Sequence, residues 1–445
     1  MREKEFLPLV RERLNIEALN PMQKKMMEHA SRPCDLILLS PTGSGKTLAF
    51  VLPVLKLLRP STGRVQAVVV APSRELVIQI AGIIGAIAAG FKVTALYGGH
   101  KVEDEVNSLS AGTDIIVATP GRMLDHINRR NIDVLPTRIL VLDEFDKSLE
   151  LGFEKEMKKI TGHLKNVSRM ILTSATDADV LPQFLQLRDP VTLDFREDNG
   201  DLRRRTRVHR VDSDADDKLA ALLTLIENLA AEAGEYGRCI VFVNHRESAE
   251  RTCAYLKNNG VPAVLYHGAI DQRCREQAVA MFNNGSRPVM VATDLAARGL
   301  DIRGVRSVVH YHQPLTAATY THRNGRTARV DAEGDVYVLV GPKEDVREYV
   351  EFDRDFYLDG TKRFGGRPGF ETLFFSAGKK EKLSRGDILG FLVKEGGLAA
   401  AEIGKIEVFD HYSLAAIPAR EAAATVERIR GKKIKGEKRI MSLLD

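Results

Sequence analysis

The chain carries Ser40-Pro41-Thr42-Gly43-Ser44-Gly45-Lys46-Thr47 between an apolar run, Asp35–Leu39, and an apolar helical pattern. This order of strand, loop and helix is the setting of a P-loop, where backbone N–H groups and a helix N-terminus surround phosphate oxygens. The glycines let the backbone approach the phosphates, although Ser40 replaces the usual first glycine. We therefore expect Thr42 to Lys46 to bind ATP phosphates and the Thr47 hydroxyl to ligate Mg²⁺.

A second phosphate-site element follows at Ile139–Glu144, where an apolar run ends in Asp143-Glu144. An apolar strand that ends in two acids is the Walker B pattern. We expect Asp143 to hold Mg²⁺ through water and Glu144 to polarise the attacking water. An acidic turn at a strand end would look the same, but its position behind a P-loop favours the catalytic interpretation.

The rest of the chain alternates short apolar runs with amphipathic stretches, which predicts parallel α/β sheets. Four runs in the first part (67–71, 93–97, 114–118 and 138–142) are answered in order by four in the second part (239–243, 261–266, 288–292 and 306–310). Such ordered repetition indicates a duplicated fold. We predict two tandem RecA-like domains, residues 1–202 and 203–358, with a polar hinge near 196–207.

A glycine-rich boundary at 359–369 precedes a small α+β domain, residues 370–445. Residues 373–375 and 406–409 are predicted strands, and residues 399–403 and 422–429 are predicted helices. Seven basic residues gather near the end and favour a polyanion partner, although a solvated helix end is the alternative: Arg428, Arg430, Lys432, Lys433, Lys435, Lys438 and Arg439. Four aromatic residues are able to stack on bases, but core packing is the commoner role of each: Phe374, Phe375, Phe409 and Tyr412.

Composition adds broad limits. The 445 residues carry a formal net charge of +5, which fits a polyanion partner without requiring one. The four cysteines contain no Cys-x-x-Cys pair, so reduced thiols are expected rather than a zinc or disulfide framework. No apolar run approaches the ~18 residues that span a bilayer. These features predict a cytoplasmic protein with no membrane contact.

From about Phe6 to Phe352 the chain resembles the DEAD-box RNA helicases of superfamily 2. Asn20-Pro21-Met22-Gln23, with Phe6 upstream, resembles the Q motif, which implies that Gln23 reads adenine and Phe6 stacks on it. Ser174-Ala175-Thr176 resembles the motif that couples ATP state to RNA binding. The resemblance also implies an RNA-contacting set: Arg74, Gly99, Thr119, Gly121, Arg122, Thr293 and Arg298.

In the second domain, Gln272 and Arg275 fit the Gln-x-x-Arg element of that family, and Asp301 is implied to hold the ribose. The stretch His322–Arg329 resembles motif VI, which implies that Arg326 and Arg329 reach the γ-phosphate. Phosphoryl transfer needs such cations, and an arginine finger is worth ~10³–10⁵ in rate. If these arginines lie on the opposite domain, hydrolysis requires domain closure. The catalytic set is then Lys46, Asp143, Glu144, Arg326 and Arg329.

Two positions depart from the family. The Asp-Glu-Ala-Asp signature is Asp143-Glu144-Phe145-Asp146 here, so all three acids remain but packing must accommodate a larger side chain, near Ser174. Motif VI has Asn324 and Ala328 where the family often has an aliphatic residue and glycine. Neither change removes a charge that the chemistry needs.

The tail resembles the RNA-binding domain of the DbpA group, on segments that include Ser376–Lys380 and Ile434–Gly436. That group's module is a divergent RRM, which implies an RRM-like fold here and binding to a hairpin of large-subunit ribosomal RNA. Lysines expected to contact RNA are Lys379, Lys380, Lys432, Lys433 and Lys435. No clean RNP1 pattern is present.

Three interpretations stay open. The first is an RNA-stimulated ATPase that unwinds short duplexes during large-subunit ribosome assembly. The second is a general RNA chaperone for cold adaptation or RNA decay, and the third is a nucleotide-gated RNA clamp with little hydrolysis, suggested by Phe145. All three expect ATP, Mg²⁺ and RNA. The resemblance disfavours DNA as substrate, and we expect a monomer.

Overall fold

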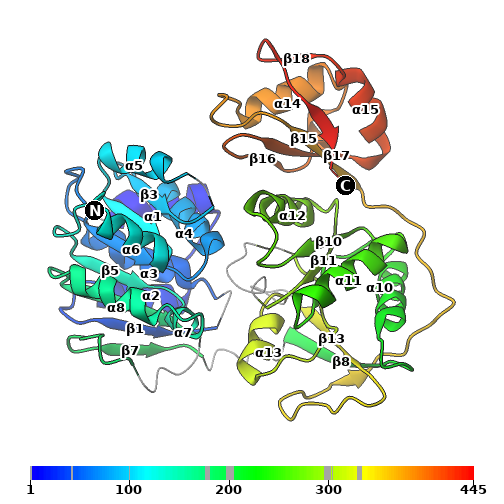
Figure 1. Cartoon of the computed structure of the whole chain (residues 1–445), viewed down its shortest axis with the longest axis horizontal. Helices are drawn as coiled ribbons and strands as arrows, with labels where there is room; N and C mark the ends of the chain where they lie inside the picture. Colours follow the sequence, from blue (N-terminus) through cyan, green and yellow to red (C-terminus); the bar gives the residue numbers. More distant parts are fainter. Residues whose placement is uncertain are drawn as a thin grey trace. The chain divides into compact units, whose positions relative to one another are not determined.

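The computed structural model describes residues 3–41, 44–99, 101–175, 181–196, 205–294, 302, 304–327 and 333–444. The chain forms two compact units, the first ending with strand β7 (Val191–Asp194) and the second starting with strand β8 (Thr206–Asp212) (Figure 1). Each unit is built around its own parallel sheet, and the second unit also contains a small antiparallel sheet. No helix in the described ranges combines the length and apolar character that crossing a membrane requires.

The first unit is a parallel sheet in the order β3-β4-β2-β5-β6-β1-β7. Its strands are β1 Leu36–Leu39, β2 Ala67–Val70, β3 Val93–Leu96, β4 Ile115–Ala118, β5 Ile139–Leu142, β6 Arg169–Ser174 and β7 Val191–Asp194. Its helices are α1 Glu3–Leu14, α2 Pro21–His29, α3 Lys46–Leu57, α4 Arg74–Ile87, α5 Val102–Ser110, α6 Pro120–Asn128, α7 Phe145–Glu150 and α8 Glu154–His163. The central strands are apolar throughout because two separate cores, one on each face, bury them.

The second unit opens with the sheet order β10-β11-β9-β12-β13-β8-β14. Its strands are β8 Thr206–Asp212, β9 Cys239–Phe242, β10 Ala263–Tyr266, β11 Val289–Ala292, β12 Ser307–His310, β13 Gly334–Val340 and β14 Arg354–Asp355. Its helices are α10 Leu219–Ala233, α11 Arg246–Asn258, α12 Gln272–Asn284 and α13 Ala317–Asn324. Adding seven to each strand number of the first sheet reproduces this order, which confirms the predicted duplication.

The small C-terminal domain is an antiparallel sheet in the order β16-β17-β15-β20. Its elements are β15 Phe370–Phe375, α14 Arg385–Lys394, β16 Ile406–Val408, β17 Ser413–Pro418, α15 Ala422–Ile429 and β20 Met441–Leu443, with a hairpin of β18 Lys433–Ile434 and β19 Glu437–Lys438. This β-α-β-β-α-β order, with the first strand in the sheet's centre, is the arrangement expected of an RRM-like fold. The predicted helix at 399–403 is only a single 3₁₀ turn, Ala400–Glu402, because the flanking Ala399 and Ile403 both have extended backbone.

Candidate functional site

The strand order divides the predicted motifs of the first unit into two groups. The P-loop follows β1, the acidic pair follows β5 and Ser174 ends β6, and these three strands are neighbours in the order β5-β6-β1. Arg74, Gly99 and Thr119 follow β2, β3 and β4, which are neighbours at the other side of the sheet. In parallel sheets, ligands bind beyond the carboxyl ends of the strands. One sheet edge thus separates the predicted phosphate-site residues from the predicted RNA-contacting residues.

The P-loop ends where helix α3 begins, at Lys46. Gly45 adopts φ +91°, a conformation that favours glycine. The Lys46 side chain is buried, and its Nζ donates a hydrogen bond to the Ser40 carbonyl, 2.9 Å away. The Ser44 hydroxyl donates to the Pro41 carbonyl at 2.9 Å. The lysine is therefore folded over its own loop, close to where a phosphate would be held. Thr42 and Gly43 lie outside the described residues.

Helix α2 is attached to this loop by its first turn. Asn20 and Gln23 form a capping box, with Gln23 N donating to Asn20 Oδ1 (2.8 Å) and Asn20 N to Gln23 Oε1 (3.0 Å). Asn20 Nδ2 also donates to the Ser44 carbonyl at 3.0 Å, and Gln23 Nε2 to the Gly45 carbonyl at 3.4 Å. A Cβ on Gly45 would lie 2.8 Å from Gln23 Nε2. Gln23 therefore positions the P-loop in this structure, and Asn20 is a partner that sequence reasoning missed.

The structure corrects the expectation that Phe6 stacks on adenine. Its side chain has 0% exposure and belongs to the same core cluster as Met22 and Met26. A ring enclosed in this way has no free face for an adenine. The reason is the amphipathic pattern of α1, which buries Phe6 and Val10 one turn apart. Phe6 fixes α1 to the domain instead.

The acidic pair is buried behind the P-loop. Thr173 Oγ1 donates to Asp143 Oδ1 at 2.5 Å and accepts from the Glu144 amide at 3.1 Å. Burial, and then the neighbouring Glu144 carboxylate, raises the pKa of Asp143 to about 6. A buried carboxylate that ionises reluctantly is a group that a cation would stabilise, so Asp143, which interacts electrostatically with Lys46 of the P-loop, fits a Mg²⁺ site. Thr173 is a second residue that the sequence analysis did not identify.

Backbone contacts connect the acidic turn, the P-loop and the end of β6. The Ser40 amide donates to the Ser174 carbonyl at 3.0 Å, and the Ala175 amide donates to Asp146 Oδ2 at 3.4 Å. Phe145 is buried in the core beneath this turn, among the side chains that α7 and β6 share. The larger side chain is accommodated in this core, which also contains Met170 and Leu172 of β6. Thr176, the other predicted coupling residue, lies outside the described residues.

The predicted RNA contacts of the first unit meet at three adjacent loops. Arg74 lies against the glycine pair, since a Cβ on Gly98 would be 3.2 Å from Arg74 Nη2. Gly99 adopts φ +104°, and the Thr119 amide donates to the Leu96 carbonyl at 3.0 Å. Gly121 lies in the first turn of α6, with nothing within 4 Å of where a Cβ would be. The structure thus brings these four positions to one loop cluster.

Arg122 is positioned by a buried carboxylate that sequence reasoning missed. Its Nε lies 2.7 Å from Oε2 of Glu105, which is only 3% exposed. The same Glu105 accepts a hydrogen bond from the Tyr97 amide at 2.9 Å, and its Oε2 is 2.7 Å from His126 Nε2. Glu105 therefore fixes Arg122 relative to the loop that contains Gly99.

In the second unit the motifs are organised around a different arginine from those predicted. Arg323 is fully buried, and its guanidinium donates to Asp294 Oδ1 at 2.5 Å, Asn244 Oδ1 at 2.8 Å and the His312 carbonyl at 2.8 Å. These bonds tie three loops at the strand ends together. Arg326, three residues after Arg323, and Thr293, next to Asp294, are also buried. Three other predicted residues lie outside the described ranges: Arg298, Asp301 and Arg329.

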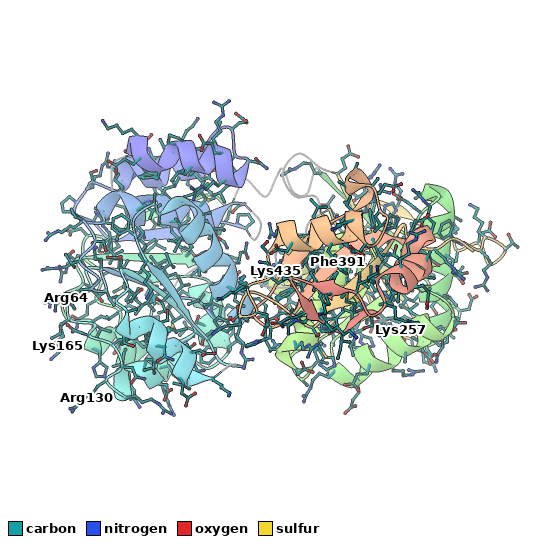
Figure 2. All side chains as sticks on the ribbon, turned by 90° about the horizontal axis from the view of Figure 1, so that it is seen from above. Arg64, Arg130, Lys165, Lys257, Phe391 and Lys435 are labelled. Atoms are coloured by element: carbon teal, nitrogen blue, oxygen red, sulfur yellow. The ribbon has the colours of Figure 1, made fainter. Side chains whose placement is uncertain are left out.

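The lysines of the C-terminal domain come from two segments that the fold brings together. Lys435, which Figure 2 labels, donates from Nζ to the Lys382 carbonyl at 2.7 Å and pairs with Asp387 of α14 at 2.9 Å. Lys435 (φ +51°) and Gly436 (φ +82°) both have positive φ, as type I′ hairpin turns require. The shared surface exposes the predicted lysines, one of which, Lys432, also pairs with Glu395 at 3.2 Å: Lys379, Lys380, Lys432, Lys433 and Lys435.

The four aromatic residues of this domain are largely withdrawn from solvent. Phe375 lies in the core under α14 and α15, while Phe374 and Tyr412 are buried on the opposite face with Phe409 stacked on Tyr412 at 4.5 Å. Packing is therefore their role in this structure, as the sequence analysis favoured.

Comparison with known proteins matches three consecutive families. Residues 20–183 match the DEAD/DEAH box helicase family, 217–331 the helicase conserved C-terminal domain and 372–442 the DbpA RNA binding domain. The chain is 31% identical over 434 residues to the ATP-dependent RNA helicase DbpA of Escherichia coli (strain K12), covering 94% of this chain and 93% of that protein. It is 31% identical over 349 residues to the DEAD-box ATP-dependent RNA helicase RhpA of Helicobacter pylori (strain ATCC 700392 / 26695), covering 76% and 69%.

Solved structures agree with the architecture. The DEAD-box helicase Mss116 bound to ssRNA and UDP-BeF superposes with a TM-score of 0.71 at 25% identity, covering 81% of this chain and 79% of that one. Saccharomyces cerevisiae Dbp5 bound to RNA and ADP BeF3 gives a TM-score of 0.68 at 25% identity, covering 80% and 94%. With its P-loop, acidic pair and duplicated sheets, the chain belongs to the DEAD-box family of ATP-dependent RNA helicases.

Proposed function

We propose that this DEAD-box helicase acts on large-subunit ribosomal RNA, which its C-terminal domain recognises through a hairpin. The observation that carries the proposal is the match of residues 372–442 to the DbpA RNA binding domain. The basic surface of that domain supports it, since Lys382 and Lys435 bring two lysine-bearing segments together. A tethered hairpin would raise the local concentration of nearby duplexes at the helicase core. The division of labour follows the domains 1–202, 203–358 and 370–445.

Within the core, each predicted residue has a defined task. Lys46 would supply charge at the phosphates of bound ATP, Thr47 and Asp143 would hold Mg²⁺, and Glu144 would polarise the attacking water. Gln23 reads the base, Asp301 holds the ribose, and Arg326 and Arg329 stabilise charge on the γ-phosphate. Ser174 and Thr176 couple nucleotide state to the strand. The backbone of one RNA strand is gripped in a largely sequence-independent manner by Arg74, Gly99, Thr119, Gly121, Arg122, Thr293 and Arg298. The protein would work as a cytoplasmic monomer.

The test is steady-state ATP hydrolysis without RNA, with generic single-stranded RNA, and with hairpin-containing fragments of large-subunit ribosomal RNA. The proposal expects one fragment to stimulate hydrolysis selectively. Charge reversal at two exposed lysines, Lys379→Glu and Lys433→Glu, should remove that selectivity and leave stimulation by generic RNA intact. The matched control is Lys257→Glu, an exposed lysine on α11 that is marked in Figure 2.

The other outcomes distinguish the alternatives. Equal stimulation by every RNA would replace the ribosomal target with a general RNA chaperone. Nucleotide-dependent RNA binding without measurable hydrolysis would indicate a clamp. Asp143, Glu144 and Lys46 remain in place in the described site, which favours hydrolysis over the clamp.

A further inference from the structure

The C-terminal sheet has two faces, and both are covered. Leu373 and Phe375 of β15 point toward α14 and α15 and belong to the main core of that domain. The intervening Phe374 points the other way and forms a separate apolar cluster with Tyr412, Leu414 and Ala280, which is a residue of α12. Figure 1 shows α12 of the second helicase domain beneath this face of the sheet. The face is therefore occupied by the same chain.

The centre of this contact is aromatic and cationic. The guanidinium of Arg273, in the first turn of α12, lies 5.1 Å from the ring centroids of both Phe374 and Tyr412. Both rings are less than a tenth exposed. Cation–π contacts of this kind gain strength when they are desolvated. Arg273 therefore fills the position on the aromatic face that a base would have to occupy.

A polar border surrounds this centre. Thr372 Oγ1 accepts a hydrogen bond from Asn284 Nδ2 at 2.9 Å and lies 2.6 Å from the Ser286 hydroxyl oxygen, with all three side chains buried. Arg287 donates to Glu371 Oε2 and to the Leu444 carbonyl, both at 3.1 Å. An interface with an apolar centre, satisfied polar groups and a charged border has the composition of a specific contact.

One carboxylate in this contact also touches a helicase motif. Tyr412 Oη donates to Glu276 Oε2 at 2.7 Å, and Gln272 Nε2 donates to Glu276 Oε1 at 3.2 Å. Gln272 and Arg275 are the Gln-x-x-Arg element predicted from the sequence, and Arg275 is buried on the same helix. Burial, and then the charge of Glu276, raises the pKa of Tyr412, so its hydroxyl stays protonated and donates. Glu276 thus joins the C-terminal domain to a motif of the core.

We propose that the aromatic face of the C-terminal sheet is a docking surface for α12 rather than an RNA surface, and that Glu276 is the positioning residue through which this domain acts on the helicase core. RNA bound at the lysine surface would then influence Gln272 through Tyr412 and Glu276. This deepens the proposed function and rests on it for the identity of the RNA. The docking itself depends only on the contacts above.

The functional test uses the full chain with Tyr412→Phe, which removes the hydroxyl and keeps the ring. Hairpin-driven stimulation of ATP hydrolysis should fall about tenfold, the size of one hydrogen bond to a charged group. Hairpin affinity, measured by fluorescence anisotropy, and stimulation by generic RNA should not change. Adding Glu276→Gln should have little further effect on the hairpin-driven stimulation, because both substitutions break the same link. The matched control is Tyr357→Phe at an exposed tyrosine.

Two results would overturn the proposal. A loss of hairpin affinity in Tyr412→Phe would make the aromatic face an RNA surface, and unchanged stimulation would remove Glu276 as a link. A disulfide test decides the docking independently. With Cys274→Ser as background, Ser286→Cys and Thr372→Cys should crosslink under mild oxidation, whereas Ser286→Cys with Ser384→Cys, at the N-cap of α14, should not. Absence of the first crosslink contradicts the docking, while a parent protein that does not distinguish hairpin from generic RNA contradicts only the proposed target.

Discussion

The raised pKa of Asp143 predicts that its negative charge lowers the folding stability of the nucleotide-free protein. Burial and Glu144 raise this pKa from 3.8 to about 6, so the folded protein holds the proton more tightly than the unfolded chain. The stability that this proton contributes is present in full below pH 3.8 and is lost as the pH rises through about 6. A difference of roughly two units corresponds to about 3 kcal/mol. Asp143→Asn should therefore stabilise the protein by up to about 3 kcal/mol at pH 8, while abolishing ATP hydrolysis.

The assay is urea unfolding in the presence of EDTA and absence of nucleotide, comparing Asp143→Asn with the parent at pH 8 and pH 5. The asparagine Oδ1 is still able to accept the Thr173 hydrogen bond, so the comparison isolates the charge. The advantage should fall to roughly half at pH 5, which lies inside the titration window. Other pH effects are common to both proteins and cancel.

Asp35→Asn is the contrasting control. Asp35 is also buried, but its two carboxylate oxygens accept the Met170 amide at 2.6 Å and the Arg188 amide at 2.7 Å. The NH₂ group of the asparagine would face one of these backbone N–H groups, and both are donors. This variant should therefore lose about 1–3 kcal/mol of folding stability. The reasoning is refuted if Asp143→Asn is no more stable than the parent at pH 8, or if both variants shift stability in the same direction.

Further substitutions test the other parts of the site. Gly45→Ala should weaken ATP binding at least about tenfold in a nucleotide titration, because a left-handed φ and a Cβ contact with Gln23 displace the P-loop. Glu144→Gln should retain ATP and RNA binding and lose hydrolysis in a phosphate-release assay. Glu105→Gln should raise the RNA concentration needed for half-maximal ATPase stimulation without changing its maximum, because Arg122 loses its ionic partner. Arg323→Lys should destabilise the second unit by roughly 1–3 kcal/mol in denaturant unfolding, since one ammonium group replaces the planar guanidinium that bonds Asp294, Asn244 and the His312 carbonyl.

Much of the fold followed from the sequence because its signals are local. Buried parallel strands must be continuous apolar runs, and the same run order in both halves predicted the same sheet order. The P-loop and the acidic pair were also predictable, since their spacing and flanking strands are dictated by phosphate binding. The helix predicted at 399–403 failed for the opposite reason: five residues between glycines carry too little pattern to separate a helix from a single turn.

The residues that position the site were harder to predict than those that form it. Asn20, Glu105 and Thr173 each act through one hydrogen bond or ion pair across loops distant in sequence, and a single polar residue has no periodicity to reveal it. Phe6 shows the converse error. Its upstream position matched a motif, but the amphipathic pattern of α1 buries the ring in the core.

The C-terminal sheet shows most clearly where sequence reasoning ends. The alternation of side chains along a strand predicts that Phe374 and Phe375 lie on opposite faces of the sheet, but it does not predict what covers each face. An aromatic residue on an RRM-like sheet is able to stack on a base or pack against protein, and the composition of the strand is the same in both cases. The element that packs against the sheet decides between the two. Here Arg273 of α12 covers the rings on which a base would stack, and Glu276 of α12 accepts the hydrogen bond of the Tyr412 hydroxyl. Those two residues belong to the helix that also carries Gln272. The contact that covers the aromatic face is therefore the same contact that joins the C-terminal domain to the helicase core.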